Sequence, residues 1–303
     1  MLLLTIWPIF ALICLGFALV RVGLPDPAFW PAAERINYVL LFPALLVVNL
    51  ADAPLSDPAI LRLGGATVTL VCLAAGALVA LRRVRPMRAA RFGPVLQGVV
   101  RFNTYLGLAI TAGLLDDAGL RSAAVLLAVA VPLVNVLSVL ALTGPEARRG
   151  AGDLIRPILT NPLILACALG IVIALAGTGL PFGIGRFLDL MAQASLPLGL
   201  LCVGAALQPR SARRELRTLG AVSGLRLLAM PVLAGAIALV FALGRDAAMV
   251  LVIFAAIPTA PTAYVLTRQL NGDGRLMSGL VTVQTLAAVI TIPVVLAIFG
   301  RLW

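Results

Sequence analysis

Histidine and lysine are both absent from this chain of 303 residues, and charged residues make up only 12% of it. Without histidine the chain lacks the commonest general base and the commonest metal ligand. Its four cysteines are far apart and each lies inside an apolar run. This spacing argues against zinc knuckles, CxxC redox pairs and a disulfide-stapled secreted domain. We therefore expect neither an enzyme nor a bound cofactor.

Apolar residues are abundant instead: they make up 62% of the chain, and its mean hydropathy is +1.11. A soluble domain carries about 25% charged residues and cannot bury this much apolar surface. The net charge of +11 comes from arginines that are scattered singly or in short clusters, so they do not form one nucleic-acid-binding patch. The composition predicts an all-α integral membrane protein whose surroundings are the lipid bilayer, with no nucleic-acid partner.

Ten runs are long and apolar enough to cross about 30 Å of hydrocarbon as helices. They lie at about residues 1–21, 36–52, 63–81, 93–115, 120–142, 160–178, 187–208, 216–243, 247–267 and 277–300. The first run has neither a preceding basic segment nor a following cleavage site, so we expect it to remain as an uncleaved span. The connections are short, which places function within the membrane or at its faces.

The distribution of arginines predicts the orientation, because cytoplasmic connections retain positive residues. With the N-terminus outside, sixteen of the 23 arginines fall in cytoplasmic connections, five fall on the opposite side, and Arg101 and Arg226 lie within spans. We therefore expect a multi-pass protein of the cell inner membrane or plasma membrane, with both termini outside.

The two halves of the chain share landmarks at a shift of about 154 residues. Leu15-Gly16 corresponds to Leu169-Gly170, and Gly23-Leu24-Pro25 corresponds to Gly179-Leu180-Pro181. Each half holds five spans, an odd number, so the second copy enters the membrane upside down, as in many secondary transporters. A shared bias toward leucine, alanine and glycine is the alternative explanation.

The repeat divides the chain into three parts. Residues 1–143 form the first five-helix repeat, 144–160 a cytoplasmic connector, and 161–303 the second, inverted five-helix repeat.

Helix-breaking residues interrupt the fourth and ninth spans at corresponding positions. In the ninth span, residues 257–264 contain Pro258, Thr259, Ala260, Pro261, Thr262 and Tyr264, and in the fourth span, residues 101–107 contain Arg101, Asn103, Thr104 and Gly107. Proline removes a backbone hydrogen bond, and hydrocarbon cannot satisfy the freed polar groups, so such breaks are tolerated where they line a cavity. Paired breaks in the two halves indicate a transporter site.

The chemistry offered at these breaks suits an organic anion. Interrupted helices expose N–H groups with partial positive charge, and an arginine deep in a span, such as Arg226 or Arg101, is costly enough to indicate function. Snorkelling, or a pair between Arg226 and Asp189, is the alternative. Asn135 and Gln284 lie about mid-membrane, where they either line the cavity or make structural hydrogen bonds.

These residues, taken in order, resemble the auxin efflux carrier family of membrane transporters. The resemblance is carried by Asn37 to Pro43 with the sequence Leu-Phe-Pro-Ala-Leu-Leu, by Phe102-Asn103-Thr104 with Gly107, by Asn161-Pro162, by Leu196-Pro197 with Gly204, and by Pro258-Thr259-Ala260 with Tyr264-Val265. It runs from end to end of the chain. The sequence departs from the family pattern at Ala109, where proline is frequent, and at Thr262, where asparagine is frequent.

The resemblance implies ten transmembrane helices in two inverted repeats, with broken helices 4 and 9 that cross, as in the related bile acid sodium symporters. Helices 1, 2, 6 and 7 would form a scaffold, and helices 3 to 5 and 8 to 10 a mobile transport core. It also implies carboxylate substrates, such as indole acetic acid or small dicarboxylates, and it places Asn103, Thr104, Pro258, Thr259, Ala260 and Tyr264 at the crossing.

Together these observations predict a secondary transporter that moves a small organic anion by alternating access, in the direction of efflux. The substrate-binding residues are expected to be Asn103, Thr104, Gly107, Pro258, Thr259, Ala260, Pro261, Thr262, Tyr264, Arg226, Arg101, Asn135 and Gln284. A sodium-coupled symporter of the same fold, with Asn103 and Thr262 holding the ion, is the first alternative, and a channel or membrane sensor is the second. Whether the carrier is a homodimer stays open.

Overall fold

The computed structural model describes residues 2–51, 58–115, 117–143, 160–209 and 215–302, and within these ranges the chain is helical, with turns and no strand. Its elements are α1 (Leu2–Arg21), α2 (Phe29–Ile36), the π-helix η1 (Asn37–Leu41), α3 (Phe42–Ala51), α4 (Pro58–Val84), α5 (Ala89–Val100), α6 (Thr104–Leu114), α7 (Asp117–Thr143), α9 (Pro162–Ala176), α10 (Ile184–Ala205), α11 (Leu216–Gly224), the π-helix η3 (Leu225–Ala229), α12 (Met230–Val240), α13 (Arg245–Ala256), α14 (Thr262–Gln269) and α15 (Gly274–Phe299). Each span predicted from the sequence overlaps one of these helices or a continuous series of them, except the spans at 93–115 and 247–267, each of which overlaps two helices separated by a break.

Two series of helices are continuous in the chain. The first runs from α2 through η1 to α3, and the second runs from α11 through η3 to α12, so in each a π-helical turn lies between two α-helices. The first series begins at Phe29, seven residues before the predicted start of the second span. The charged residues Glu34 and Arg35 conceal this earlier start in the sequence, because charge usually marks the end of a span, whereas the structure places both in helix α2.

Two further helices are interrupted. Helix α5 ends at Val100 and α6 begins at Thr104, and likewise α13 ends at Ala256 and α14 begins at Thr262. The breaks predicted at residues 101–107 and 257–264 are therefore present, but they are shorter than predicted, because the next helix already starts at Thr104 and at Thr262. The backbone N–H of Asn103 donates to the carbonyl oxygen of Pro258 at 2.8 Å, so the two interruptions meet.

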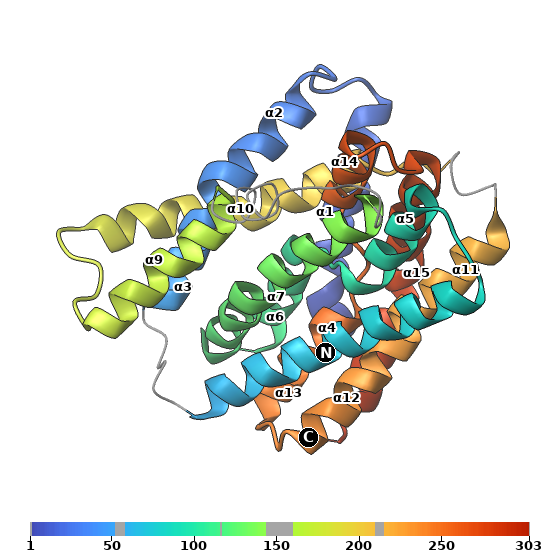
Figure 1. Ribbon diagram of the computed structural model, residues 1–303. Helices are drawn as coiled ribbons and strands as arrows, with labels where there is room; N and C mark the ends of the chain where they lie inside the picture. Colours follow the sequence, from blue (N-terminus) through green and yellow to red (C-terminus); the bar gives the residue numbers. More distant parts are fainter. Residues whose placement is uncertain (1, 52–57, 116, 144–159, 210–214, 303) are drawn as a thin grey trace.

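Close packing through glycine joins helices from the two halves of the chain. A Cβ atom on Gly16 of α1 would lie 2.0 Å from the carbonyl oxygen of Leu201 in α10, and one on Gly204 of α10 would lie 1.9 Å from the carbonyl oxygen of Ile13. Similarly, a Cβ atom on Gly170 of α9 would lie 2.7 Å from the Cβ atom of Leu50 in α3. In Figure 1, α2, α3, α9 and α10 lie together on one side, and α4, α11, α12, α13 and α15 lie on the other.

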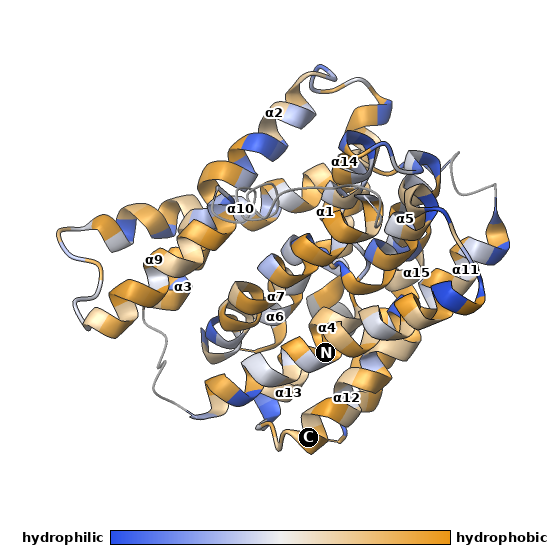
Figure 2. Ribbon diagram, in the orientation of Figure 1, coloured by the Kyte–Doolittle hydropathy of each residue, from blue (hydrophilic) through white to orange (hydrophobic). Residues whose placement is uncertain are grey.

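The outer surface of the described residues is apolar. Six helical segments are long and apolar enough to cross a membrane by length and composition, namely 29–51, 58–84, 117–143, 184–205, 216–240 and 274–299, and two shorter apolar helices are Ile6–Arg21 and Pro162–Ala176. Large apolar side chains such as Leu175, Val240 and Ile290 are more than 70% exposed. Figure 2 shows apolar colour along most of the long helices and hydrophilic colour mainly near helix ends, such as the start of α11. The protein is a multi-pass membrane protein.

Candidate functional site

A cavity of about 480 Å³ lies between α2 with η1, the second half of α7, the start of α9 and helix α14. It continues into a smaller space of about 50 Å³ that reaches the two helix breaks. Glu34, Tyr38, Arg101, Asn135 and Thr262 line both spaces, so the two form one cavity that ends at the crossing.

Arg101 lies in the extended segment between α5 and α6, where its side chain enters the cavity. Its Nη2 atom donates to Oγ1 of Thr262 at 3.5 Å, the limit of a hydrogen bond. Its Nη1 atom is buried and has no hydrogen-bond partner. Among the described residues, no carboxylate lies within salt-bridge distance of Arg101. A cation with free donors in a place of low dielectric attracts an anion strongly.

Asn103 provides a second free donor at the same place. Its side-chain oxygen accepts from the backbone N–H of Leu106 at 3.2 Å, and so caps the N-terminus of α6. The residue is only 1% exposed, and its buried Nδ2 atom has no hydrogen-bond partner. A buried amide donor without a partner is costly, so we expect an acceptor from a bound molecule to satisfy it.

The N-terminal ends of two helices also reach the cavity. Thr104 and Tyr105 begin α6, and Thr262 begins α14, and all three line the inner space. Helix N-termini carry about half a positive charge and unpaired N–H groups, which favour anions. The break that the sequence predicted thus gives the cavity two partial positive charges in addition to Arg101.

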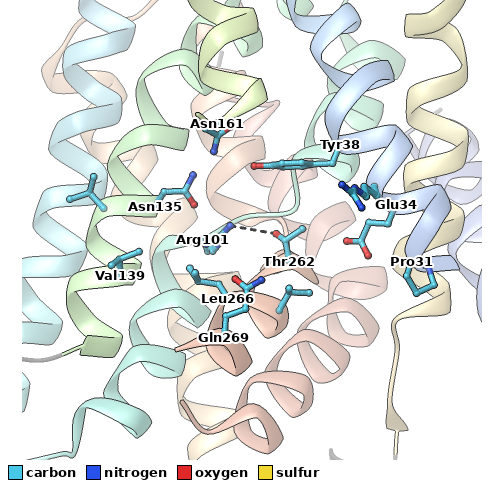
Figure 3. Close-up of a pocket in the computed structure, with 13 residues that line it drawn as sticks. Pro31, Glu34, Tyr38, Arg101, Asn135, Val139, Asn161, Thr262, Leu266 and Gln269 are labelled. Atoms are coloured by element: carbon cyan, nitrogen blue, oxygen red, sulfur yellow. Dashed lines mark hydrogen bonds between the residues drawn. The ribbon is translucent and has the colours of Figure 1, made fainter. Parts of the chain in front are cut away.

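Figure 3 shows how the cavity side chains converge. Arg101, Thr262 and Tyr38 meet in the middle, while Asn135 and Asn161 approach from one side and Glu34 from the other. Apolar side chains complete the wall: they are Pro31, Val136, Val139, Val265 and Leu266. The cavity therefore combines a few polar groups with a mostly apolar surface, as ligand sites commonly do.

The predicted site residues divide into three groups by position. Seven of them line the cavity: Arg101, Asn103, Thr104, Asn135, Ala260, Pro261 and Thr262. Four lie at the crossing and outside the cavity: Pro258, Thr259, Gln284 and Arg226. The remaining two also lie outside the cavity: Gly107 packs against Phe254 and Ile257 next to the crossing, and Tyr264 lies beside Gly274. Whether any of them binds substrate stays a prediction.

The residues at the crossing hold its backbone together. Gln284 of α15 accepts from the N–H of Thr259 at 2.9 Å and donates to the carbonyl oxygen of Gly98 at 2.9 Å. The hydroxyl of Thr259 donates to the carbonyl oxygen of Gln97 at 3.1 Å. The two bonds of Gln284 satisfy backbone groups that the breaks release. The carbonyl oxygen of Gln97 also accepts from the N–H of Arg101, so the bond from Thr259 adds a link between the two breaks. Both are structural uses of these side chains.

Sequence reasoning missed several cavity residues: Glu34, Arg35, Tyr38, Asn161 as a lining residue, and Gln269. Glu34, Tyr38 and Phe42 follow one another at intervals of four, which places them on one face of a helix. This spacing indicates a shared helix face only when the second span starts at Phe29, because a start at residue 36 leaves Glu34 outside the membrane.

Comparison with known proteins agrees with a role in transport. Residues 147–296 match the model of a family described as membrane transport protein. The chain is also 27% identical over 296 residues to an uncharacterized transporter of Methanothermobacter thermautotrophicus, a match that covers 95% of each chain. The similarity extends over nearly the whole length, so it includes both helix breaks and the cavity between them.

Proposed function

We propose a function from the premise that this chain belongs to the membrane transport protein family, which includes the auxin efflux carriers. The protein is a carrier that moves a small organic anion by alternating access, in the direction of efflux. The observation that carries the proposal is the pair of unpartnered donors, Nη1 of Arg101 and Nδ2 of Asn103, in a cavity at the meeting of two helix breaks. The family supports a transporter and not an enzyme.

The charge of the cavity supports an anion. Arg101 is its inner cation, two helix N-termini face it, and Arg35 is exposed at its outer part. Glu34 is the carboxylate on the wall among the described residues. An anion with an apolar body fits such a site, because its charged group can meet Arg101 and Asn103 while Val139 and Leu266 contact the rest.

Helix packing supports the inverted repeat of five and five helices. Gly16 of α1 packs against α10, and Gly170 of α9, its counterpart at the repeat shift, packs against α3. The two broken helices, α5 with α6 and α13 with α14, correspond in the same way. We propose that α1, α2, α3, α9 and α10 form the scaffold and that α4 to α7 with α11 to α15 form the transport core.

The arginine distribution supports a direction for the cavity. The cavity lies beside α2 and η1, the start of α9 and helix α14. The starts of α2 and α9 and the end of α14 adjoin three of the connections that are expected to be cytoplasmic, because cytoplasmic connections retain positive residues. We propose that the structure is the inward-facing state of the carrier, with both termini outside an inner or plasma membrane.

Replacement of Asn103 tests the site. We expect Asn103→Ala to reduce uptake of indole-3-acetate or succinate into proteoliposomes about tenfold, since a donor to the anion and the cap of α6 are both lost. Asn103→Asp retains the capping oxygen and replaces the donor by a negative charge, so it should unfold near the wild-type temperature and transport no better than the alanine variant. Asn49→Ala is the control, because the side-chain amide of Asn49 donates to the carbonyl oxygen of Leu45 outside the cavity.

Unimpaired transport by both Asn103 variants would refute this site. Measurement with and without a sodium gradient distinguishes a uniport or exchange carrier from a sodium-coupled one, and saturation of the initial rate distinguishes a carrier from a channel. A thermal-shift screen against carboxylates identifies the substrate, because a ligand of the folded state raises the melting temperature.

Movement between scaffold and core predicts a second effect, at Gly199 of α10. A Cβ atom there would lie 2.6 Å from the ring of Tyr105 in α6 and 2.8 Å from Nδ2 of Asn37. We expect Gly199→Ala to force α6 away from α10, and so to slow transport about tenfold by disfavouring this conformation. Initial rates in proteoliposomes measure it, with Gly220→Ala, where a Cβ meets nothing within 4 Å, as the control. Equal rates would show that no moving contact lies at Gly199.

A further inference from the structure

Three backbone carbonyl groups at the crossing have no backbone donor available. In a regular helix the carbonyl oxygens of Phe254 and Ile257 would accept from residues 258 and 261, but both are proline and have no N–H. The carbonyl oxygen of Val99 would accept from the N–H of Asn103, which donates to Pro258 instead. All three groups lie in the buried interior, where an unsatisfied carbonyl is costly.

One side chain satisfies all three. The Nε atom of Arg226 donates to Ile257 at 2.7 Å, Nη1 donates to Val99 at 2.9 Å, and Nη2 donates to Phe254 at 2.5 Å. Arg226 is 1% exposed, and no carboxylate among the described residues lies within salt-bridge distance of it. Neither snorkelling nor a pair with Asp189 therefore explains its position.

The surroundings of Arg226 suit a positive charge. Its three acceptors belong to the C-terminal ends of α5 and α13, which carry partial negative charge from the helix dipoles. Arg226 itself lies in the π-helix η3, and a π-helical turn is a frequent device for placing a functional side chain. The planar guanidinium, with donors spread over five N–H groups, can reach three acceptors at once, which an ammonium group cannot do as well.

We propose that Arg226 is a positioning residue for the cavity: by joining the C-terminal ends of α5 and α13, its guanidinium fixes where α6 and α14 begin. The connections between these helix ends are short, from Arg101 to Asn103 and from Ile257 to Pro261. A shift of either C-terminal end therefore displaces the donors of Arg101 and Asn103. The role in substrate binding rests on the function proposed above, whereas the joining of the two helix ends does not.

Purified Arg226→Ala tests the joining of the helix ends without a substrate. We expect its melting temperature to fall at least about 5 °C further than that of Arg62→Ala, because Arg62 donates to one carbonyl group, that of Ala242, from an exposed position. Guanidinium chloride at about 20 mM, far below denaturing concentrations, should restore part of the loss in Arg226→Ala and should not stabilise the wild type or Arg62→Ala.

Arg226→Lys extends the test to positioning and covers the case in which the alanine variant does not fold. It should unfold between the wild type and Arg226→Ala, and its KM for indole-3-acetate or succinate uptake should rise about tenfold. A merely structural residue would lower only the maximal rate, in proportion to the folded protein, and would leave KM unchanged.

Two kinds of result, one in stability and one in transport kinetics, would overturn the proposal. One is an Arg226→Ala protein that is as stable as Arg62→Ala and indifferent to guanidinium, or an Arg226→Lys protein as stable as the wild type. The other is a KM that Arg226→Lys leaves unchanged. If neither anion is transported by the wild type, the function proposed above fails for these substrates, and the thermal measurements still decide whether Arg226 joins the helix ends.

Discussion

Arg101→Gln is expected to lower the transport of organic anions by about 100-fold at low substrate concentration, while leaving the protein folded. A hydrogen bond to a charged group contributes about 1.5–3 kcal/mol, and the buried position of Nη1 makes the upper part of this range the relevant one. At about 1.4 kcal/mol for each factor of ten, the loss approaches two orders of magnitude. Initial rates of uptake into proteoliposomes measure it.

The protein should tolerate this change because Arg101 has few partners to lose. Its one side-chain hydrogen bond within the protein, among the described residues, is the 3.5 Å contact with Thr262. Glutamine is shorter and uncharged, and it can still lie in the half-buried position. The melting temperature should therefore stay within a few degrees of the wild type. Arg226 is the contrast, since all three of its donor groups are engaged.

Arg35→Gln is the matched control. Arg35 lines the outer part of the same cavity but is exposed, so water screens its charge and the pair it makes with an anion is worth little. Its replacement should change the rate by about threefold at most. Equal losses in the two variants would mean that the anion is attracted by the general charge of the cavity and not by a specific donor of Arg101.

Gly204→Val is expected to lower the melting temperature by about 6–12 °C. The Cβ atom would lie 1.9 Å from the carbonyl oxygen of Ile13 and 2.8 Å from the backbone nitrogen of Phe17. Both atoms belong to the backbone of α1 and cannot turn aside as a side chain could. Overpacking costs about 1–3 kcal/mol, and a contact with backbone lies at the upper end, which at about 2–4 °C per kcal/mol gives this shift.

The measurement is thermal unfolding in detergent, with Gly76→Val as the control. Gly76 lies in α4, is exposed, and has nothing within 4 Å of a Cβ, so its change should lower the melting temperature little. Gly16→Val, on the other side of the same contact, should resemble Gly204→Val, because it would meet Leu201 in the same way. A Gly204→Val protein as stable as the wild type would show that α1 and α10 are not closely packed.

The helices and their two interruptions could be predicted from the sequence because both have strong local causes. Apolar length determines the spans, and Pro258 and Pro261 determine the break after α13, since neither can donate to the preceding turn. The break after α5 has no proline, and it was predicted from the polar residues at the position that corresponds to the other break; the structure adds that Asn103 is the N-cap of α6. Its correspondence to the other break followed from the repeat, and the meeting of the two breaks was implied by the family resemblance.

The partners of the buried residues could not be predicted in the same way. Arg226 was recognised as a deep cation, but its partners are carbonyl groups, which every residue carries and which leave no mark in the sequence. Thr259 shows the same limit: the family resemblance places it at the crossing, while its hydroxyl and N–H bind Gln97 and Gln284. Glu34 could not be predicted for another reason: a charged residue before an apolar run usually lies outside the membrane span.

The bond from the N–H of Asn103 to the carbonyl oxygen of Pro258 has a consequence for the design of variants. The bond joins main-chain atoms, so neighbouring side chains can be substituted without losing it, provided that the local backbone stays unchanged. Val139 and Leu266 on the cavity wall can therefore be varied in a combinatorial library while the framework beneath them is kept. Under the function proposed above, selection for resistance to toxic carboxylates should yield exporters of altered preference.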